Sequence, residues 1–469
     1  MKFALLFLLF FLIIPGYSRQ EDSLIYWEPE TLLVPGPSEN FSPELTAQGH
    51  SLYLVWEVLD SVVKFMKTDD EGNTWTEPMI ISDTLAGHRP HIKVWDNNIH
   101  CVWYTYTHSG GLDSTCYRKS TDQGATWDSI KFLGGTYHLT GIEVFADTIF
   151  VLRFITDTIP YVTYIIRSTD GGNTWSPPSY VVEVGFGWEN PIVYNQGVLH
   201  VVVMTNLWQP DGIFYVRSTD LGETWSDTLR LSGLNCYLPK QPKIVKNDQG
   251  VLFVAWPDSR GAGWGDNIYL SKSTDNGITW SPEILVSNTG NVSHDHCFCT
   301  NNQNLYFVWP RSYQALDFRM SMDQGETWQN VETLCSNDLQ GPTIASTFDK
   351  VHVIWHDMRI PNYHCFYYRR GIRSTGIQEQ NPRETKYYFS VEPTVCQDKI
   401  VLTYNFSEEL VNKAKILFVD ASGSVIEKLS CGKGKNRIVY DTCKISPGVY
   451  FLVFQAGEKM QVKKIIIVK

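Results

Sequence analysis

The chain has 469 residues, of which 43% are hydrophobic, and this length suits one large domain followed by a small one. A formal net charge of −11 excludes the basic surface of nucleic-acid-binding proteins, so we expect no nucleic-acid partner. The 16 Trp residues and an aromatic content of 13% favour packed sheets over helices.

The N-terminus has the pattern of a secretory signal peptide. Lys2 precedes an apolar run, Phe3 to Ile14, that is too short to span a bilayer. Gly16 and Ser18 then supply the small residues of a cleavage site. We expect residues 1–18 to be removed on export, with an uncleaved anchor as the alternative. No later apolar run is long enough for a membrane span, so we expect none in the mature chain.

An octet with the pattern Ser/Thr-x-Asp-x-Gly-x-Thr-Trp occurs six times between residues 68 and 328. Its carboxylate can accept hydrogen bonds from its own turn, its glycine permits a positive φ, and its Trp packs into a sheet. Six equivalent acids cannot share one active site, so we interpret them as structural. The aspartates stand 48 to 55 residues apart, the length of a propeller blade, and are Asp70, Asp122, Asp170, Asp220, Asp275 and Asp323.

The segments between the octets predict four strands per repeat. The first strand follows a proline such as Pro90, and the second commonly ends in a Trp such as Trp256. Seven strand sets can be counted, but the last, Gly341 to Arg370, lacks an octet and a fourth strand. The segment Trp27 to Leu33 resembles the other fourth strands. We therefore predict that it completes the last blade and leaves no open sheet edge in the ring.

The octet resembles the Asp-box, or bacterial neuraminidase repeat. The resemblance implies an all-β fold in which residues 19–373 form a seven-bladed sialidase-like β-propeller. Six blades is the alternative, because sialidases have six. Sialidases also carry an arginine in a Phe/Tyr-Arg-Ile-Pro motif where the first propeller strand begins. Asn40-Phe41-Ser42-Pro43 stands there without an arginine, and Arg359-Ile360-Pro361 lies in the last blade, so sialidase activity is not favoured.

Strand direction places the octets on one face of the ring, so we expect a ligand on the opposite face, near the channel. Guanidinium groups grip carboxylates and indole rings stack on sugars. On this reasoning the candidate ligand-binding residues are Arg89, Arg260, Arg311, Arg359, Trp188 and Trp264. A hydrolase would need two carboxylates about 5 to 10 Å apart, and the candidate acids are Asp258, Asp295, Asp357 and Glu189.

A structural role is the alternative for two of these Asp–Arg pairs. Trp-x-Asp-x-Arg occurs at Trp256 and again at Trp355, and this repetition favours an Asp–Arg pair that only fixes the conformation of a loop. Tyr104 and Tyr313 are candidate nucleophiles by location alone. No motif for a cofactor or a metal is present, so we expect neither.

The chain has ten cysteines and no Cys-x-x-Cys pair, which argues against zinc. Two pairs are placed to form disulfides, Cys101 with Cys116 and Cys431 with Cys443, with free thiols as the alternative.

A polar linker, residues 374–390, leads to a C-terminal domain, residues 391–469. Its alternating strands at 399–404, 415–420, 438–441, 449–455 and 461–468 predict a small antiparallel, immunoglobulin-like β-sandwich. Three segments, Ile416–Gly423, Ile445–Phe451 and Lys463–Lys469, resemble the type A sorting domains of type IX secretion. That resemblance implies recognition by the outer-membrane export machinery. An accessory domain without a sorting role is the alternative.

These observations predict a secreted or cell-surface propeller that binds a glycan or another extracellular ligand, such as a protein, and favour a role without catalysis. Two alternatives stay open. One is a glycoside hydrolase, exo-sialidase-like, that acts on extracellular glycans. The other is a surface structural protein with no ligand.

Overall fold

The computed structural model describes residues 25–36, 39–59, 61–83, 86–105, 114–134, 138–155, 162–183, 191–205, 212–260, 266–287, 292, 295–337, 339–360, 363–373, 388–392, 395–396, 398–405, 414–420, 425–429, 436–456 and 459–468. The predicted signal peptide lies outside these residues. All the regular secondary structure in them is β. The chain divides into two compact units, Met1–Thr375 and Gly376–Lys469, and each is described by itself.

The described residues of the first unit form seven sheets, which we number in chain order. Sheets 1 to 6 have four strands each. They are β3 (Asn40–Gln48), β4 (Ser51–Val58), β5 (Val63–Thr68) and β6 (Met79–Ile80); β7 (His88–Trp95), β8 (Asn98–Thr105), β9 (Ser114–Ser120) and β10 (Lys131–Phe132); β11 (His138–Phe145), β12 (Thr148–Ile155), β13 (Val162–Ser168) and β14 (Ser179–Val182); β15 (Ile192–Asn195), β16 (Val198–Thr205), β17 (Gly212–Ser218) and β18 (Leu229–Arg230); β19 (Lys243–Lys246), β20 (Leu252–Asp258), β21 (Asn267–Ser273) and β22 (Ile284–Leu285); and β23 (Cys297–Asn301), β24 (Asn304–Arg311), β25 (Ala315–Ser321) and β26 (Glu332–Cys335).

Sheet 7 combines the two ends of this unit. It contains β27 (Leu339–Ser346), β28 (Lys350–Asp357) and β29 (Cys365–Arg373), and β29 also pairs with β1 (Ile25–Trp27) and β2 (Thr31–Val34). The predicted pairing of the N-terminal segment with the last strand set is confirmed. A glycine is required at Gly371, because a Cβ there would lie 2.5 Å from the Ile25 side chain and 2.9 Å from that of Trp27.

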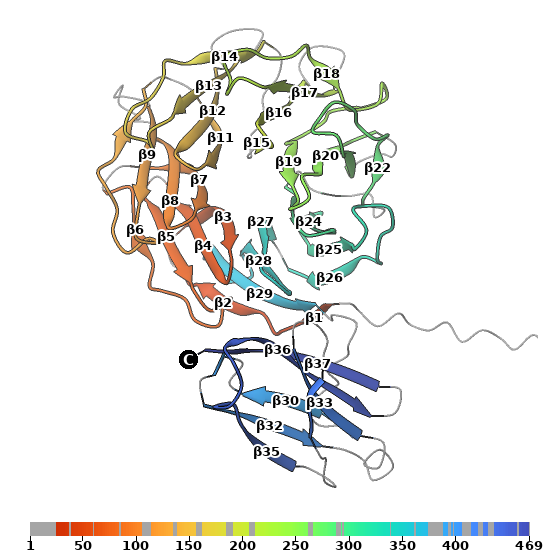
Figure 1. Ribbon diagram of the computed structural model, residues 1–469. Coiled ribbons are helices and arrows are strands. Elements are labelled where there is room, and N and C mark those ends of the chain that lie inside the picture. The colour runs from red at the N-terminus through yellow and green to blue at the C-terminus, as the bar shows by residue number, and fades with distance from the viewer. Residues whose placement is uncertain are drawn as a thin grey trace, which may run out of the picture. The chain divides into compact units, whose positions relative to one another are not determined.

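The seven sheets surround a common centre, with their first strands innermost (Figure 1). A hydrogen bond or ion pair joins each first strand to the next, and the series returns to its starting strand. The contacts, in order around the ring, are Leu45 N to Thr343 Oγ1 at 3.0 Å, Ile92 N to Glu44 Oε1 at 3.4 Å, Lys93 Nζ to Glu143 Oε2 at 3.7 Å, Tyr194 N to Glu143 Oε1 at 3.3 Å, Lys246 Nζ to Tyr194 O at 2.5 Å, Thr300 Oγ1 to Lys246 O at 3.0 Å and Ser346 Oγ to Thr300 O at 3.2 Å.

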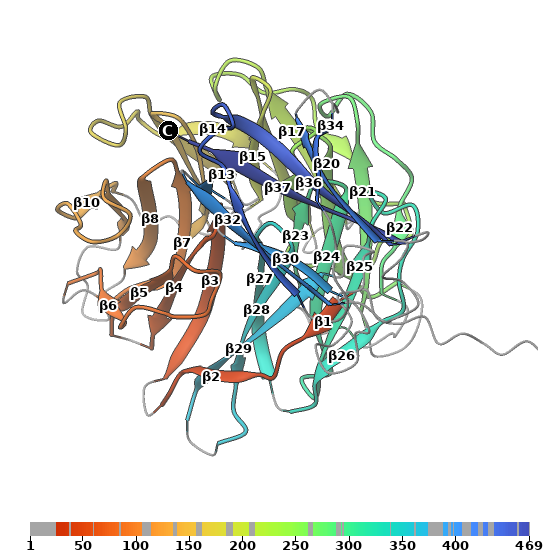
Figure 2. The same cartoon turned by 60° about the horizontal axis from the view of Figure 1, so that its bottom comes forward.

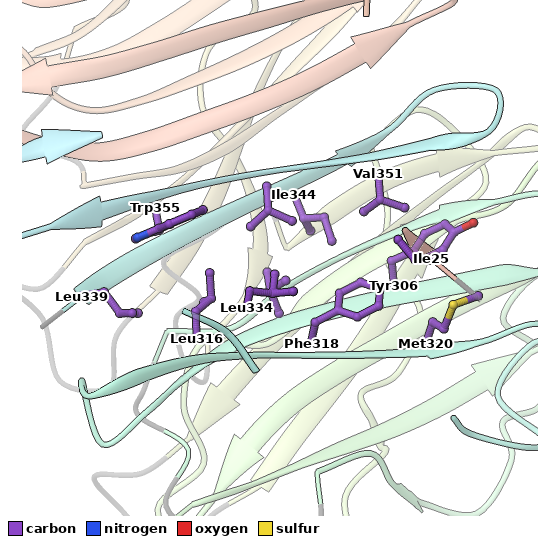
Figure 3. Close-up of a cluster of buried hydrophobic side chains, with 12 residues drawn as sticks. Ile25, Tyr306, Leu316, Phe318, Met320, Leu334, Leu339, Ile344, Val351 and Trp355 are labelled. Carbon is purple, nitrogen blue, oxygen red and sulfur yellow. The ribbon is translucent and has the colours of Figure 1, made fainter. Parts of the chain in front are cut away.

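Apolar side chains fill the space between neighbouring sheets. Figure 3 shows one such cluster, in which Leu316 and Phe318 of sheet 6 face Ile344 and Trp355 of sheet 7, with Ile25 beside them. Each buried aliphatic or aromatic side chain of this size contributes about 1.5–3 kcal/mol to stability. The core therefore lies between the sheets, and each sheet depends on both of its neighbours.

A second set of contacts links neighbouring sheets beside the octets. A cation at the end of a third strand donates to the carbonyl of the residue that follows the octet aspartate in the next sheet. These carbonyls belong to residues with φ between 56° and 68°, a conformation that turns them away from their own hairpin. The pairs are Lys119–Gly171 at 2.9 Å, Arg167–Leu221 at 2.8 Å, Arg217–Asn276 at 3.3 Å, Lys272–Gln324 at 3.1 Å and Arg370–Glu71 at 2.8 Å. The last pair joins sheet 7 to sheet 1.

The second unit contains two sheets in its described residues. One has β30 (Tyr388–Glu392), β32 (Lys399–Asn405) and β35 (Asn436–Asp441). The other has β31 (Val395–Cys396), β33 (Ala414–Asp420), β34 (Val425–Leu429), β36 (Gly448–Ala456) and β37 (Lys459–Ile467). Figure 2 shows β36 and β37 side by side. Buried side chains of both sheets, such as Leu402 and Phe418, share one core.

The five predicted strands of the second unit correspond to β32, β33, β35, β36 and β37, and three further strands, β30, β31 and β34, were not predicted. The described strands pair in the antiparallel sense that was predicted, except that β31 runs parallel to β37. β31 has only two residues, which is too short for an alternating pattern of apolar and polar residues, so the sequence did not predict this strand.

Candidate functional site

The octet aspartates are fully engaged in their own turns. In the first octet, Asp70 Oδ1 accepts hydrogen bonds from the Thr68 hydroxyl at 2.6 Å and from Thr74 N at 2.9 Å, and its Oδ2 accepts from the Thr74 hydroxyl at 2.7 Å. The bonds from Thr68 and Thr74 lower the pKa of Asp70 to about 2. The other five aspartates accept the same three bonds.

Backbone contacts fix the face on which the octets lie. Glu71 N, in the first octet, donates to His50 O in the turn between β3 and β4, at 3.0 Å. Gln324 N donates in the same way to Gln303 O, in the turn between β23 and β24. The octets therefore share a face with the turns between first and second strands. We call the other side, where second strands end and first strands begin, the opposite face.

Arg260, on the opposite face, is held by two acids of sheet 5 and by Asn235 Oδ1, which lies in the linker before that sheet, at 3.1 Å. Its Nε donates to Asp258 Oδ1 at 2.9 Å, and its two terminal nitrogens donate to Glu283 at 2.5 and 2.7 Å. The guanidinium lies 4.1 Å from the centre of the Tyr269 ring. Asp258 also accepts from Trp256 Nε1 at 3.2 Å. This arrangement, which we call the arginine clamp, connects the second, third and fourth strands of one sheet.

Arg359 forms an equivalent clamp in sheet 7. It donates to Asp357 at 2.9 and 2.6 Å, forms an ion pair with Glu30, and lies 3.9 Å from the centre of the Tyr367 ring. Trp355 Nε1 donates to Asp357 at 3.0 Å. Glu30 precedes β2 just as Glu283 precedes β22, so this clamp fastens the N-terminal segment. Neither glutamate was among the candidates predicted from the sequence, although each follows a proline in the same Pro-Glu pair.

The other candidate arginines lie in other sheets. Arg311 Nε donates to Asp317 Oδ2 at 2.8 Å inside sheet 6. Arg89, the second residue of β7, has φ of 48°, and its backbone N donates to Glu57 Oε2 at 2.5 Å. The structure thus places the four arginines in four different sheets, three of them paired with an acid of their own sheet. Trp188, Trp264 and Glu189 lie outside the described residues.

The candidate acids differ in their environment. Asp258 and Asp357 are buried and ion-paired in the clamps. Asp295, half-buried, accepts a hydrogen bond from Gly341 N at 3.4 Å. Among the described candidates, Asp295 is therefore the acid that retains contact with solvent.

Tyr313 lies in the same region of the opposite face. Burial, Asp295 and Asp266 raise the pKa of Tyr313, so its hydroxyl is protonated at neutral pH. Asp266 accepts from Lys240 Nζ at 2.8 Å and from the Ser259 hydroxyl at 2.5 Å. These residues come from the linkers and turns of sheets 5 and 6, and only two of them, Asp295 and Tyr313, were predicted from the sequence.

A second polar group lies where β3 and β7 begin. His91 Nδ1 is 2.5 Å from Glu44 Oε2, and Glu57 accepts from Arg89 N. Burial raises the pKa of Glu44, but His91, Lys93 and the backbone N of Ile92 together outweigh that effect, and the net shift is downward. In the part of the chain that the structure describes, no three His, Cys, Asp or Glu side chains are placed to hold a metal ion.

The described cysteines that were candidates for disulfides are thiols. Cys116 lies opposite Trp103 and Cys101 opposite Arg118 on β8 and β9, and both cysteines are free. Burial raises the pKa of Cys116 to about 12, so this thiol is protonated at neutral pH. Cys443 is also free, and Cys431 lies outside the described residues.

Comparison with known families assigns both units. Residues 150–357 match the BNR repeat-like domain, and residues 393–468 match the secretion system C-terminal sorting domain. The chain carries both domains. The sorting domain places the protein outside the cell, on the surface or secreted. Within the described residues there is no helix with the length and hydropathy of a membrane span.

A relative of the chain among curated proteins is named a xyloglucanase. Over 125 residues the chain is 28% identical to the xyloglucanase Xgh74A of Acetivibrio thermocellus, a match over 26% of this chain and 14% of that protein. The chain therefore spans a small part of that relative's length.

Solved structures share the fold at low identity. A PL25 ulvan lyase superposes with a TM-score of 0.51 at 11% identity, over 71% of this chain and 95% of the lyase. The polysaccharide lyase Uly1 superposes with a TM-score of 0.51 at 12% identity, over 71% of this chain and 89% of that one. These likenesses support an all-β, propeller-like domain and by themselves carry no activity.

Proposed function

We propose that the protein is exported and binds an extracellular glycan on the opposite face of its BNR repeat-like domain. The observation that carries this proposal is a pair of exposed tyrosines beside buried polar groups. Tyr237 is 53% exposed and Tyr313 is 38% exposed. Ser259 connects Tyr237 to Asp266, because its N donates to Tyr237 O at 2.8 Å and its hydroxyl to Asp266 at 2.5 Å. Exposed aromatic rings beside fixed polar groups suit sugar recognition.

The polysaccharide-active relatives add support for a glycan ligand. The xyloglucanase and the two lyases differ in chemistry, but their names share a polysaccharide as the molecule acted on. Identity to each is low, so what is proposed for this chain is the ligand class and not a reaction.

We further propose that the scaffold is a seven-bladed propeller over residues 19–373, followed by the linker and an immunoglobulin-like sandwich that engages the export machinery. The circular series of contacts between first strands supports seven blades. Because both oxygens of each octet aspartate are bonded in the turn, these residues serve the scaffold.

A sialidase-like reaction is less well supported. Gripping a sialic acid carboxylate requires arginines that converge on one point. Arg260, Arg311 and Arg359 instead point their guanidinium groups at acids of three separate sheets. Asp258 and Asp357 are committed to the arginine clamps, so neither is poised as a general acid.

The test is a binding screen of the full exported chain against a panel of extracellular polysaccharides, with release of reducing ends and of unsaturated products measured in parallel. The variant is Tyr237→Ala. Its matched control is Phe348→Ala, which removes an aromatic ring that is 70% exposed in a turn on the octet face. We expect binding that Tyr237→Ala weakens and Phe348→Ala does not. Product release that depends on Asp295 would favour the hydrolase, and no binding to any glycan would favour a structural role.

A further inference from the structure

The turn between β24 and β25 has an unusual backbone. Gln314 N donates to Arg311 O at 3.0 Å, which closes a four-residue β-turn. Its two central residues, Ser312 and Tyr313, have φ of 52° and 59°. Two positive φ values in a hairpin turn mark the type I′ conformation, in which Asn-Gly or Gly-Gly is strongly preferred. This chain has Ser-Tyr there.

The choice of residues opposes local stability. A side chain with a Cβ is strained in the left-handed region, and a bulky aromatic residue is among the least suited to it. The surrounding structure holds the turn in place, because Leu339 N donates to Tyr313 O at 3.0 Å. Strain that persists under such support is commonly found where a side chain must be presented for function.

Tyr313 is presented as a donor and a stacking surface. Its side chain is 38% exposed, and its phenol is protonated at neutral pH, as an ordinary tyrosine with a pKa of about 10 is. A neutral phenol can donate one hydrogen bond to a sugar hydroxyl while its ring face covers the apolar face of a pyranose. A protonated phenol is a poor nucleophile, which argues against the catalytic role that location alone suggested.

The charges around this turn restrict the ligand. Four cations among the described residues of this face in sheets 5 to 7 are paired with a carboxylate: Lys240 with Asp266, Arg260 with Asp258, Arg311 with Asp317 and Arg359 with Asp357. The whole chain carries a formal net charge of −11. To pair with these cations, a polyanionic chain would have to displace the acids that already neutralise them. If it did not displace them, its own negative charges would lie beside the acids without a cation to pair with. Both situations are unfavourable.

We propose that Tyr313 is the central contact of a site for neutral polysaccharide chains, and that the strained turn exists to present it. This proposal rests on the proposed glycan-binding function and specifies its site and ligand class. The exposed Tyr237, joined to the Asp266 side chain through Ser259, supplies a second contact for an extended chain.

The experiment measures binding of the full exported chain to xyloglucan, a neutral polymer, and to ulvan, a sulfated one, by affinity electrophoresis and calorimetry. We expect binding to xyloglucan with little dependence on salt and none to ulvan. Tyr313→Ala should raise the Kd at least about 10-fold, the loss typical of a central aromatic contact. Tyr313→Phe keeps the ring but loses the hydroxyl, so its Kd should lie between those of the unsubstituted protein and Tyr313→Ala.

Two further variants separate binding from folding. Tyr313→Gly relieves the strain and should raise the Tm while weakening binding as much as Tyr313→Ala does. Ser312→Gly should raise the Tm and leave the Kd within about two-fold, because Ser312 has no assigned contact with the ligand.

The outcomes distinguish the two proposals. Xyloglucan binding that Tyr313→Ala leaves unchanged would overturn the site while sparing the glycan-binding function. Preferential, salt-sensitive binding of ulvan would overturn the neutral ligand class. Failure to bind any glycan of the panel would overturn the proposed function and this inference with it.

Discussion

At the scale of single residues, the octet shows how one side chain can organise a turn. Asp220 accepts bonds from the Ser218 hydroxyl at 2.7 Å, from Thr224 N at 2.9 Å and from the Thr224 hydroxyl at 2.5 Å. Asp220→Ala removes both acceptor oxygens and with them all three hydrogen bonds. We expect a loss of about 1 kcal/mol in the free energy of unfolding, measured by urea titration, with unchanged glycan binding. A loss of binding without destabilisation would place the octets in the ligand site.

The same residues make stability depend on pH. Hydrogen bonds from Thr224 and Ser218 lower the pKa of Asp220 to about 2, whereas an unfolded Asp titrates near about 3.9. Between these values the unfolded chain binds more protons, so acidification from about pH 4 to about pH 2 destabilises the fold. We expect this decrease in urea titrations, and a smaller one in Asp220→Asn, which cannot titrate. Equal decreases in the two proteins would contradict the assignment.

At the scale of strands, the N-terminal segment substitutes for a missing fourth strand. Its place could be predicted because Trp27-Glu28-Pro29-Glu30 repeats the pattern of Trp280-Ser281-Pro282-Glu283. The contact of Glu30 with the arginine clamp of sheet 7 could not be predicted. Its partner Arg359 lies more than three hundred residues away, and no local pattern connects the two. The same limit applies to the polar group around Asp266, whose members come from separate linkers.

The stability of sheet 7 should depend on the contacts that join β29 to the N-terminal segment and to sheet 1, which we call the seam. Arg370 donates to Glu28 at 2.8 and 3.0 Å and to Glu71 O and Asn73 at 2.8 Å each, which joins β29 to the N-terminal segment and to sheet 1. We expect Arg370→Ala to cost about 1–2 kcal/mol in the free energy of unfolding, because it removes a half-buried ion pair with Glu28 and two hydrogen bonds to sheet 1. Hydrogen exchange should quicken in β1 and β2.

Arg217→Ala is the matched control for the seam, because Arg217 makes the equivalent contact between sheets 4 and 5, to Asn276 O at 3.3 Å. The Arg217→Ala substitution should lower the free energy of unfolding by less than Arg370→Ala does, and it should leave hydrogen exchange in β1 and β2 unchanged. Equal effects of the two substitutions would show that the seam has no special role in holding the ring together.

At the scale of the whole molecule, the octets lie on one face of the first unit, the proposed binding site lies on the opposite face, and the second unit matches a sorting domain. The all-β class, the repeat and the sorting domain were accessible from sequence because each leaves a recurrent local signature. The proposed ligand site was not accessible in this way, because Tyr237, Asp266 and Tyr313 come from separate linkers and turns of sheets 5 and 6. The periodicity of the sequence predicts where strands lie, but it does not predict which turns of different sheets lie close together in the folded protein.

The separation of the units yields a prediction about function. A variant that ends at residue 375 retains every residue proposed to bind the glycan. We expect it to bind with the affinity of the full chain, measured by calorimetry, and to fail to leave the cell, measured by fractionation. Loss of affinity in this variant would mean that the sorting domain contributes to the site.

The central claim is that the ligand binds the face opposite the octets. Hydrogen exchange of the full chain, with and without saturating xyloglucan, tests it most directly. We predict slower exchange at residues 237–241 and 312–314, with the six octets unchanged. Protection concentrated at the octets, with none in those two segments, would contradict the account.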